Sequence, residues 1–374
     1  MARSLHDMVI EIKSHHDVFD REAGESEAIA DATPALVDVM REIRVPLVKA
    51  PVEVNGDRLS LADQCRYFTA LAYENPTAAW TGFNHAGAAG MAGARLTDEG
   101  LNMLFGSDPV PFFAAVAAPT GTFTKVDGGV TMTGTWNYAS GVKHSRWAML
   151  TALEATGAPE VRIGIIRLED AVVHGDWDVM ALKGTGSVSI TVDAVFVPDA
   201  LVVDPMQGPL RGGPMFGLGY GPYVAGENLG FTFGVCSRFL DELVTYANGK
   251  SRGFDGRLAD RGAFQYELAR SIQQFKAAQS HALVTLAEAG AACESNGALS
   301  SREEKEIAAM ATFCTQSSVD SITRLMTFAG AGALFGSSVL QRCFRDAHGS
   351  AQHLVVANSS FDRYGAEVLA VARG

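Results

Sequence analysis

The feature that most constrains the fold is the order in which hydrophobic periodicity changes along the chain. Over residues 22–105 the apolar residues recur at helical spacing, whereas over 113–203 they alternate with every second residue. A bridge rich in glycine and proline, 208–222, separates this β-like segment from four long helical patterns. Those patterns cover residues 231–247, 262–293, 301–328 and 337–356. A helical segment, a β segment and a helical bundle in this order occur together in few folds.

This order predicts an α+β chain of three domains: a helical domain over 1–109, a central β domain over 110–207 and a helical bundle over 208–374. Four long helices can bury their apolar faces against one another as an antiparallel bundle. Within the β segment, Asp127-Gly128 predicts the turn of a hairpin, because this dipeptide favours tight two-residue turns. Further strands are expected over 161–168 and 188–197.

Charge and composition exclude several classes of protein. The 30 Lys and Arg against 42 Asp and Glu give a net charge of −12, which disfavours binding to nucleic acid or to an anionic membrane. The N-terminus lacks the apolar region of a secretion signal, and no apolar run approaches the ~20 residues of a membrane helix. The five cysteines are widely spaced, which predicts reduced thiols in the cytoplasm, and the histidines show no spacing typical of metal ligands.

One segment, residues 134–147, places three side chains where they could contact a flat ring. If the segment is a strand, Trp136, Tyr138 and Ser140 project to one face before Gly141 bends the chain. Two aromatic walls and a hydroxyl on one face suit a heteroaromatic cofactor. Taken alone, the segment fits a cross-strand aromatic pair about equally well.

A second segment carries a resemblance to a known family. Residues 180–198, with Gly184-Thr185-Gly186-Ser187 and a closing Phe196-Val197-Pro198, resemble the β-domain signature of the acyl-CoA dehydrogenase superfamily. Four other stretches in the right order are similar to its motifs, so that the resemblance covers nearly the whole chain: 72–80, 250–254 with 264–265, 328–332 and 345–347. It implies the fold of that superfamily and a homotetramer in which each flavin site borrows residues from a neighbour.

The chain departs from the dehydrogenases at their catalytic base. They commonly carry a glutamate about nine residues beyond the Arg-Asp-Ala motif, where this chain has His353 and Leu354. Without a carboxylate there, desaturation has no proton acceptor. Together with the pattern Trp-x-Tyr-Ala-Ser-Gly-x-x-His-x-x-Trp over 136–147, His353 resembles the flavin-dependent monooxygenase branch instead. That branch includes two-component hydroxylases of phenols, steroid phenol rings, dibenzothiophene and indoles.

The resemblance implies an oxygenase that inserts one atom of O2 into an aromatic or heteroaromatic substrate of phenol or indole type, through a flavin C4a-hydroperoxide. Reduced FAD or FMN, with FAD favoured, would come from a separate NAD(P)H:flavin reductase, and the chain shows no nucleotide-binding fingerprint of its own. Three alternatives stay open. They are an acyl-CoA dehydrogenase whose base has moved to Glu227 or Glu242, an N-hydroxylase of an amine or amino sugar, and a scaffold without catalysis.

For the cofactor, the resemblance implies that Ser140 lies at the N5/O4 edge of the flavin and that Tyr138 supports the ring from beneath. Gly141 belongs to the same contact segment, while Trp136 fits packing better than cofactor contact. Arg252 would bind the flavin phosphates, against the alternative of a surface ion pair with Asp255 or Asp260. Gln265 and Gly330 are further cofactor candidates.

Four histidines are candidates for the chemistry. His353 is expected seven residues after Asp346 on the last helix and on the same face, as a proton acceptor or donor. His348 competes with it from a direction about 140° away at 100° per residue. His85 fits a substrate contact or a structural group about equally. His144 contacts flavin or substrate, or caps the strand end.

Overall fold

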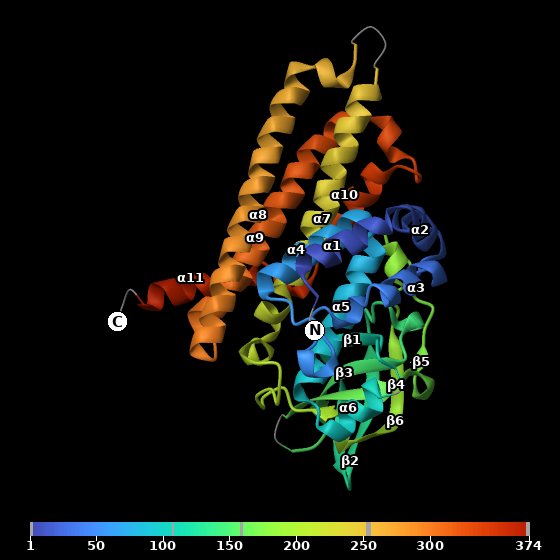
Figure 1. The fold of residues 1–374 in the computed structure, drawn as a ribbon, viewed down its shortest axis with the longest axis vertical. Helices are drawn as coiled ribbons and strands as arrows, with labels where there is room; N and C mark the ends of the chain where they lie inside the picture. Colours follow the sequence, from blue (N-terminus) through green and yellow to red (C-terminus); the bar gives the residue numbers. More distant parts are fainter. Residues whose placement is uncertain (1–2, 107, 158–159, 252–255, 372–374) are drawn as a thin grey trace. The chain divides into compact units, whose positions relative to one another are not determined.

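The computed structural model describes residues 3–106, 108–157, 160–251 and 256–371, which form two compact units (Figure 1). Unit 1 comprises Met1–Leu59, Thr77–Val179 and Lys183–Gly217. Unit 2 comprises Ser60–Pro76, Met180–Leu182 and Leu218–Gly374. This grouping places the N-terminal helices with the sheet, and one early helix with the bundle. The three-domain division over 1–109, 110–207 and 208–374 stays a prediction.

The helices of unit 1 begin where side chains can cap them. Ser4, Thr33 and Thr97 each accept a hydrogen bond from a backbone N–H in the first turn of the helix that follows. These helices, with α2 and α5, have the following bounds: α1 (Leu5–Ser14), α2 (His16–Ile29), α3 (Pro34–Glu42), α5 (Pro76–Arg95) and α6 (Asp98–Phe105). Helical structure therefore starts well before residue 22, where the hydrophobic pattern first predicts it.

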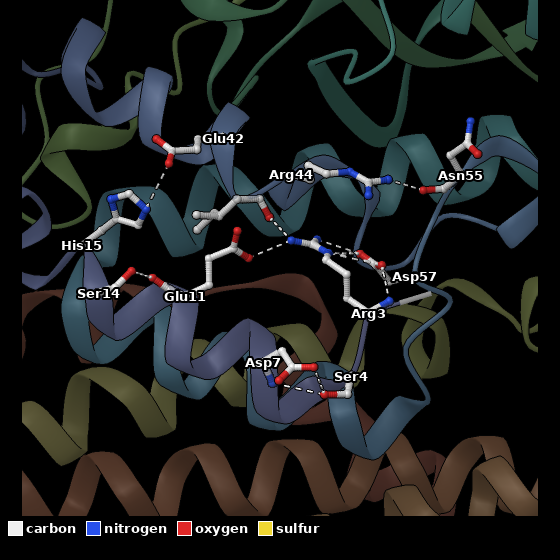
Figure 2. Close-up of polar contacts among 11 residues, drawn as sticks. Arg3, Ser4, Asp7, Glu11, Ser14, His15, Glu42, Arg44, Asn55 and Asp57 are labelled. Carbon is white, nitrogen blue, oxygen red and sulfur yellow. Dashed lines mark hydrogen bonds and ion pairs between the residues drawn. The ribbon is translucent and has the colours of Figure 1, made fainter. Parts of the chain in front are cut away.

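The N-terminal arm is held to unit 1 by Arg3 (Figure 2). Its guanidinium donates to Asp57 Oδ2 at 2.7 Å, to Glu11 Oε2 at 2.9 Å and to the Ile43 carbonyl at 2.8 Å. The Asp57 carboxylate is buried, so its charge needs such a partner. One arginine thus joins the start of α1 to the loop that follows α3.

A seven-stranded sheet completes unit 1, in the order β5-β6-β2-β1-β3-β4-β7. The predicted hairpin is confirmed: β1 and β2 pair antiparallel up to Val126 and Gly129, and Gly128 adopts φ +74° in the turn. The strands are β1 (Phe113–Val126), β2 (Gly129–Trp136), β3 (Trp147–Glu154), β4 (Val161–Arg167), β5 (Val172–Val173), β6 (Ile190–Pro198) and β7 (Val202–Val203). The strands expected over 161–168 and 188–197 correspond to β4 and β6.

Unit 2 is a helical bundle in which α8 and α9 run side by side (Figure 1). Its helices are α4 (Leu61–Glu74), α7 (Tyr220–Gly249), α8 (Gly262–Asn296), α9 (Ser301–Ala329), α10 (Val339–Ser350) and α11 (Ser359–Val371). The expected helix over 337–356 is wrong at its C-terminal end, because α10 stops at Ser350. The short 3₁₀ segment η11 (Leu354–Val356) and α11 follow it.

Glycines explain why α4 packs so closely on α7. A Cβ at Gly226 would lie 2.5 Å from the Leu61 carbonyl oxygen, and one at Gly230 would lie 2.6 Å from that of Cys65. The two glycines are four residues apart and therefore share one face of α7. Only residues without a side chain allow the two backbones to approach this far.

All five cysteines are buried and free. Across the described parts of the chain, none of the helices is both long and apolar enough to cross a membrane.

Candidate functional site

The candidate flavin segment leaves the sheet earlier than the alternation predicts. β2 ends at Trp136, and Tyr138 adopts a left-handed backbone with φ +67°. The prediction that Trp136, Tyr138 and Ser140 share one face is therefore wrong, since side chains alternate regularly only while the backbone stays extended. Trp136 is fully buried and donates its indole N–H to the Thr151 carbonyl at 2.7 Å, while Tyr138 is 73% exposed.

Ser140 lies in a chain of three buried hydroxyls. Its Oγ is 2.7 Å from Ser187 Oγ, which in turn is 2.6 Å from Thr185 Oγ1. The backbone completes the link, because the Gly141 N–H donates to the Thr185 carbonyl at 3.0 Å. The two segments that carry the family resemblance thus meet at this point, and they hold the Ser140 hydroxyl in place.

His85 and His144 form a second hydrogen-bonded chain in unit 1. His85, on α5, places Nδ1 2.7 Å from the Phe113 carbonyl and Nε2 2.9 Å from Nε2 of His144. His144 ends the 3₁₀ segment η3 (Val142–His144) directly after Gly141. A Cβ at Gly141 would lie 2.6 Å from His85 Cε1 and 3.0 Å from His144 Nε2. The glycine therefore makes room for the imidazole pair.

Both imidazoles of this pair are held neutral. Burial, reinforced by the Arg41 guanidinium, lowers the pKa of His144 to about 4. Burial and the adjacent His144 also hold the pKa of His85 well below its usual range, although the Phe113 carbonyl acts in the opposite direction. Arg41 itself stacks over the Phe112 ring, with 4.7 Å between the guanidinium carbon and the ring centroid. Phe112 packs edge-on against both histidine rings.

The two C-terminal histidines occupy different elements of unit 2. His353 was expected on the same helix as Asp346, but that prediction is wrong because His353 directly precedes η11. Its Nδ1 accepts a hydrogen bond from the Val355 N–H at 3.4 Å. Burial lowers the pKa of His353 to about 4. His348 does lie on α10, where its Nε2 is 3.0 Å from Thr323 Oγ1 and its ring packs on Phe344.

The remaining cofactor candidates have ordinary structural contacts or cannot be placed. Gln265, on α8, donates from its side chain to the Ala259 carbonyl at 2.9 Å. Gly330 ends α9 with φ +68°. Arg252 and its alternative partner Asp255 lie outside the described residues. Among the residues that are described, no cluster of three or more His, Cys, Asp or Glu side chains could hold a metal ion.

The carboxylates considered as a relocated base also differ. Glu242 forms an ion pair with Arg238 on α7, with 2.8 Å between Arg238 Nε and Glu242 Oε1. Glu227 is fully buried on the same helix. Glu227 is thus the stronger of these two candidates.

The chain is similar in sequence and fold to known proteins. Residues 230–358 match the family model described as "Acyl-CoA dehydrogenase, C-terminal domain". The structure of XiaF from Streptomyces sp., in complex with FADH2 and glycerol, matches with a TM-score of 0.88 at 22% identity, over 98% of this chain and 96% of that one. The chain therefore has the acyl-CoA dehydrogenase fold, and its residues 230–358 match the C-terminal domain of that family.

Two curated relatives match most of the chain. The oxygenase component of p-hydroxyphenylacetate 3-hydroxylase from Acinetobacter baumannii is 25% identical over 339 residues, 85% of this chain and 78% of that protein. Indole-3-acetate monooxygenase from Acinetobacter baumannii is 24% identical over 360 residues, 92% of this chain and 89% of that protein. The resemblance to the flavin-dependent monooxygenase branch, and with it the predicted fold class, is confirmed.

Three groups at the candidate site were not assigned a role from the sequence. Ser187 and Thr185 hold Ser140, and the Phe113 carbonyl anchors His85. The two hydroxyls stand in the Gly-Thr-Gly-Ser turn, so the resemblance contained a signal for them. A backbone carbonyl leaves no trace in residue identity, and only the folded structure could reveal the Phe113 contact.

Proposed function

We infer that this chain is the oxygenase component of a two-component flavin-dependent monooxygenase, inserting one oxygen atom from O2 into an aromatic or heteroaromatic substrate. The observation that carries this conclusion is His353. Where dehydrogenases of the superfamily place a carboxylate base, this chain has an imidazole whose Nδ1 accepts a backbone N–H. In its neutral form that ring carries its proton on Nε2, which makes it a hydrogen-bond donor and not a base for desaturation.

The residues of unit 1 fit a reduced flavin. Tyr138 offers an exposed aromatic ring beside Trp177, with ring centroids 6.5 Å apart, and Ser140 offers a hydroxyl that can both donate and accept. A reduced flavin presents an N–H donor at N5 and a carbonyl acceptor at O4, which match such a hydroxyl. When bound, the flavin supplies the reaction with O2. FAD is our choice over FMN, with Gln265, Gly330 and Arg252 as further contacts.

Individual roles follow from these contacts. Ser140 holds the flavin edge, with its hydroxyl oriented by Ser187. Tyr138 supports the ring. His353 is the proposed proton donor or acceptor, and His348 is the competing candidate. His85 and His144 belong to the substrate side of the site, His144 in direct contact and His85 through its hydrogen bond to His144.

Partners and setting complete the proposal. A separate NAD(P)H:flavin reductase supplies the reduced flavin, and the chain assembles as a homotetramer in the cytoplasm. Phenols and indoles are the favoured substrates, consistent with the compounds named for the two curated relatives.

The test is a titration of the purified protein with reduced and oxidised flavin under anaerobic conditions, followed by admission of air with a phenol or indole. A protein that captures a diffusing product of another enzyme should bind reduced flavin more tightly than oxidised flavin. It should consume O2 only when reduced flavin is present and should release a hydroxylated product. Equal affinity for both redox states, or oxygen uptake without product, would contradict the proposal.

One observation favours a second function. Glu227 is a fully buried carboxylate on α7, and a carboxylate is the type of group that abstracts the proton in desaturation. An acyl-CoA desaturase using Glu227 should purify with bound oxidised flavin and bleach when an acyl-CoA is added. An N-hydroxylase would instead share the oxygen uptake and differ only in accepting an amine or amino sugar.

A further inference from the structure

We propose that Nδ1 of His144 binds the ring-borne O–H or N–H donor of the substrate, and that a hydrogen-bonded chain from the Phe113 carbonyl through His85 fixes this nitrogen as an acceptor. The proposal deepens the proposed function and rests on it. It assigns substrate selection to His144 and gives His85 the part of a positioning residue.

The direction of the chain follows from its first link. A carbonyl oxygen can only accept, so Nδ1 of His85, 2.7 Å from the Phe113 oxygen, must carry the proton of that ring. In a neutral imidazole the other nitrogen is then an acceptor. Nε2 of His85 therefore accepts across the 2.9 Å contact, and Nε2 of His144 is the donor.

The same logic fixes the far end. Because the neutral His144 ring holds its proton on Nε2, its Nδ1 presents a lone pair and no proton. The reverse arrangement would set a lone pair of His85 Nδ1 against the Phe113 oxygen at 2.7 Å, which is repulsive. A doubly protonated ring would escape this restriction. Burial of both rings and the cation of Arg41 nearby oppose that charge.

That lone pair has no partner in the described parts of the protein. Nδ1 of His144 is buried and makes no hydrogen bond with any of the described residues. An unsatisfied buried acceptor costs roughly 1–3 kcal/mol, so such atoms normally face a ligand or an ordered water. His144, which carries this acceptor, lies four residues after Ser140 in the sequence. Gly141 lies between them, and its lack of a side chain leaves room for the two imidazole rings.

The chemistry of this acceptor selects a class of substrate. A nitrogen without a proton binds a phenol O–H or an indole N–H and cannot donate to an ether, sulfide or carboxylate oxygen. An aromatic compound of equal shape that lacks the donor leaves the acceptor unsatisfied. The structure thus favours a donor-bearing phenol or indole over a sulfur heterocycle such as dibenzothiophene.

The first test is the tautomeric state of the two rings in the flavin-free protein. Long-range ¹⁵N–¹H correlation spectra of protein labelled at histidine should show His85 protonated at Nδ1 and His144 at Nε2 near pH 7, with signals assigned by His85→Gln and His144→Gln. The opposite tautomer at either ring would overturn the proposal. This measurement does not depend on flavin, so it stands even if the oxygenase function is wrong.

The second test is ligand discrimination. With reduced flavin present and oxygen excluded, the protein should bind phenol at least about tenfold more tightly than anisole, and indole more tightly than N-methylindole. In His144→Phe the preference should fall to about onefold, while His174→Gln, which changes an exposed histidine of the same unit, should keep it. His144→Asn should restore part of the preference, because the side-chain carbonyl of asparagine can accept a hydrogen bond.

The outcomes separate the two proposals. If His144→Phe keeps the full preference for phenol, the assignment of His144 is wrong while the oxygenase function stands. If neither the parent protein nor any variant binds reduced flavin, the proposed function fails. In that case the tautomer measurement alone decides whether the chain of Phe113, His85 and His144 exists in solution.

Discussion

Two pairs of histidines, one in each unit, differ in how their surroundings define them. His85 and His144 in unit 1 contact one another directly, and a backbone carbonyl orders their protons. His348 and His353 in unit 2 lie on different elements and have separate partners, Thr323 and the Val355 N–H. Burial lowers the pKa of all four. A lowered pKa is therefore common to both pairs. Only in the first pair do hydrogen bonds determine which nitrogen of each of two adjoining rings carries the proton.

The comparison shows that burial alone does not build a site. A buried neutral imidazole is a weak group whose role depends on which nitrogen bears the proton. In unit 1 the Phe113 carbonyl fixes the tautomer of His85 and, through the contact between the two rings, that of His144. In unit 2 a single long contact to a backbone N–H does so for His353. The first arrangement should therefore be the more sensitive to small changes in packing.

The largest effect should come from Gly141→Ala. Its φ of +72° is costly for any other residue, and the new Cβ would lie within 3.0 Å of both rings. We expect a loss of about 3 kcal/mol of unfolding free energy, from left-handed strain of about 1–2 kcal/mol and from displacement of the pair. Chemical denaturation measures it.

The matched control for that variant is Gly128→Ala. Gly128 has nearly the same φ, +74°, and a Cβ there meets no atom within 4 Å. It should lose only the strain of about 1–2 kcal/mol. Equal losses in the two variants would show that the imidazole pair does not depend on the space at Gly141.

The second prediction concerns pH. The pKa of His144 and that of His353 are both about 4 in the folded protein, below the ordinary value of 6.5 that each regains on unfolding. Between these values the unfolded chain binds more protons, so stability is present above pH 6.5 and is lost as pH falls toward 4. Each residue should account for about 1–2 kcal/mol of the loss between pH 7.5 and 5.

Denaturation at the two pH values, in the parent protein and in His144→Gln and His353→Gln, measures this dependence. Glutamine does not titrate, so each variant should show a smaller loss than the parent. A variant with an unchanged pH dependence would mean that its histidine titrates normally in the folded state.

The third prediction separates the histidines of unit 2. His353→Ala should lower the ratio of hydroxylated product to hydrogen peroxide at least about tenfold, because general acid–base groups contribute that much or more. His348→Ala should lower it less, since its Nε2 is already bonded to Thr323. Both are assayed with the same reduced flavin and substrate. The reverse order would move the proton donor to α10.

The fold was largely predictable because periodicity records burial over long stretches. The Asp127-Gly128 hairpin and the starts of α8 and α9 follow directly from the local sequence pattern. The end of α10 did not, because the stretch after Ser350 remains compatible with a helix although the backbone leaves it. For this reason the prediction that His353 shares a helix with Asp346 is wrong.

The candidate site was predictable only where side chains carry it. The motif around Ser140 identified a segment that the structure joins to Ser187, but the left-handed backbone at Tyr138 breaks the expected alternation with Trp136. Contacts made by backbone atoms, such as the Phe113 carbonyl on His85, are determined by the way distant segments pack and not by residue type. The structure supplies this part of the site.

The smallest effect is expected from Ser187→Ala, which tests how Ser140 is held. Ser187 Oγ stands between Ser140 at 2.7 Å and Thr185 at 2.6 Å, so its removal leaves the Ser140 hydroxyl in place but free to rotate. We expect a fall of about threefold in product per peroxide, equivalent to ~0.6 kcal/mol, against about tenfold for Ser140→Ala, which removes the group itself. Ser145→Ala is the control, because its hydroxyl donates to the Gly141 carbonyl in the same turn and not to Ser140. If Ser187→Ala matched Ser140→Ala, the hydroxyl chain would act as one unit; if it matched Ser145→Ala, Ser140 would need no orientation from its neighbours.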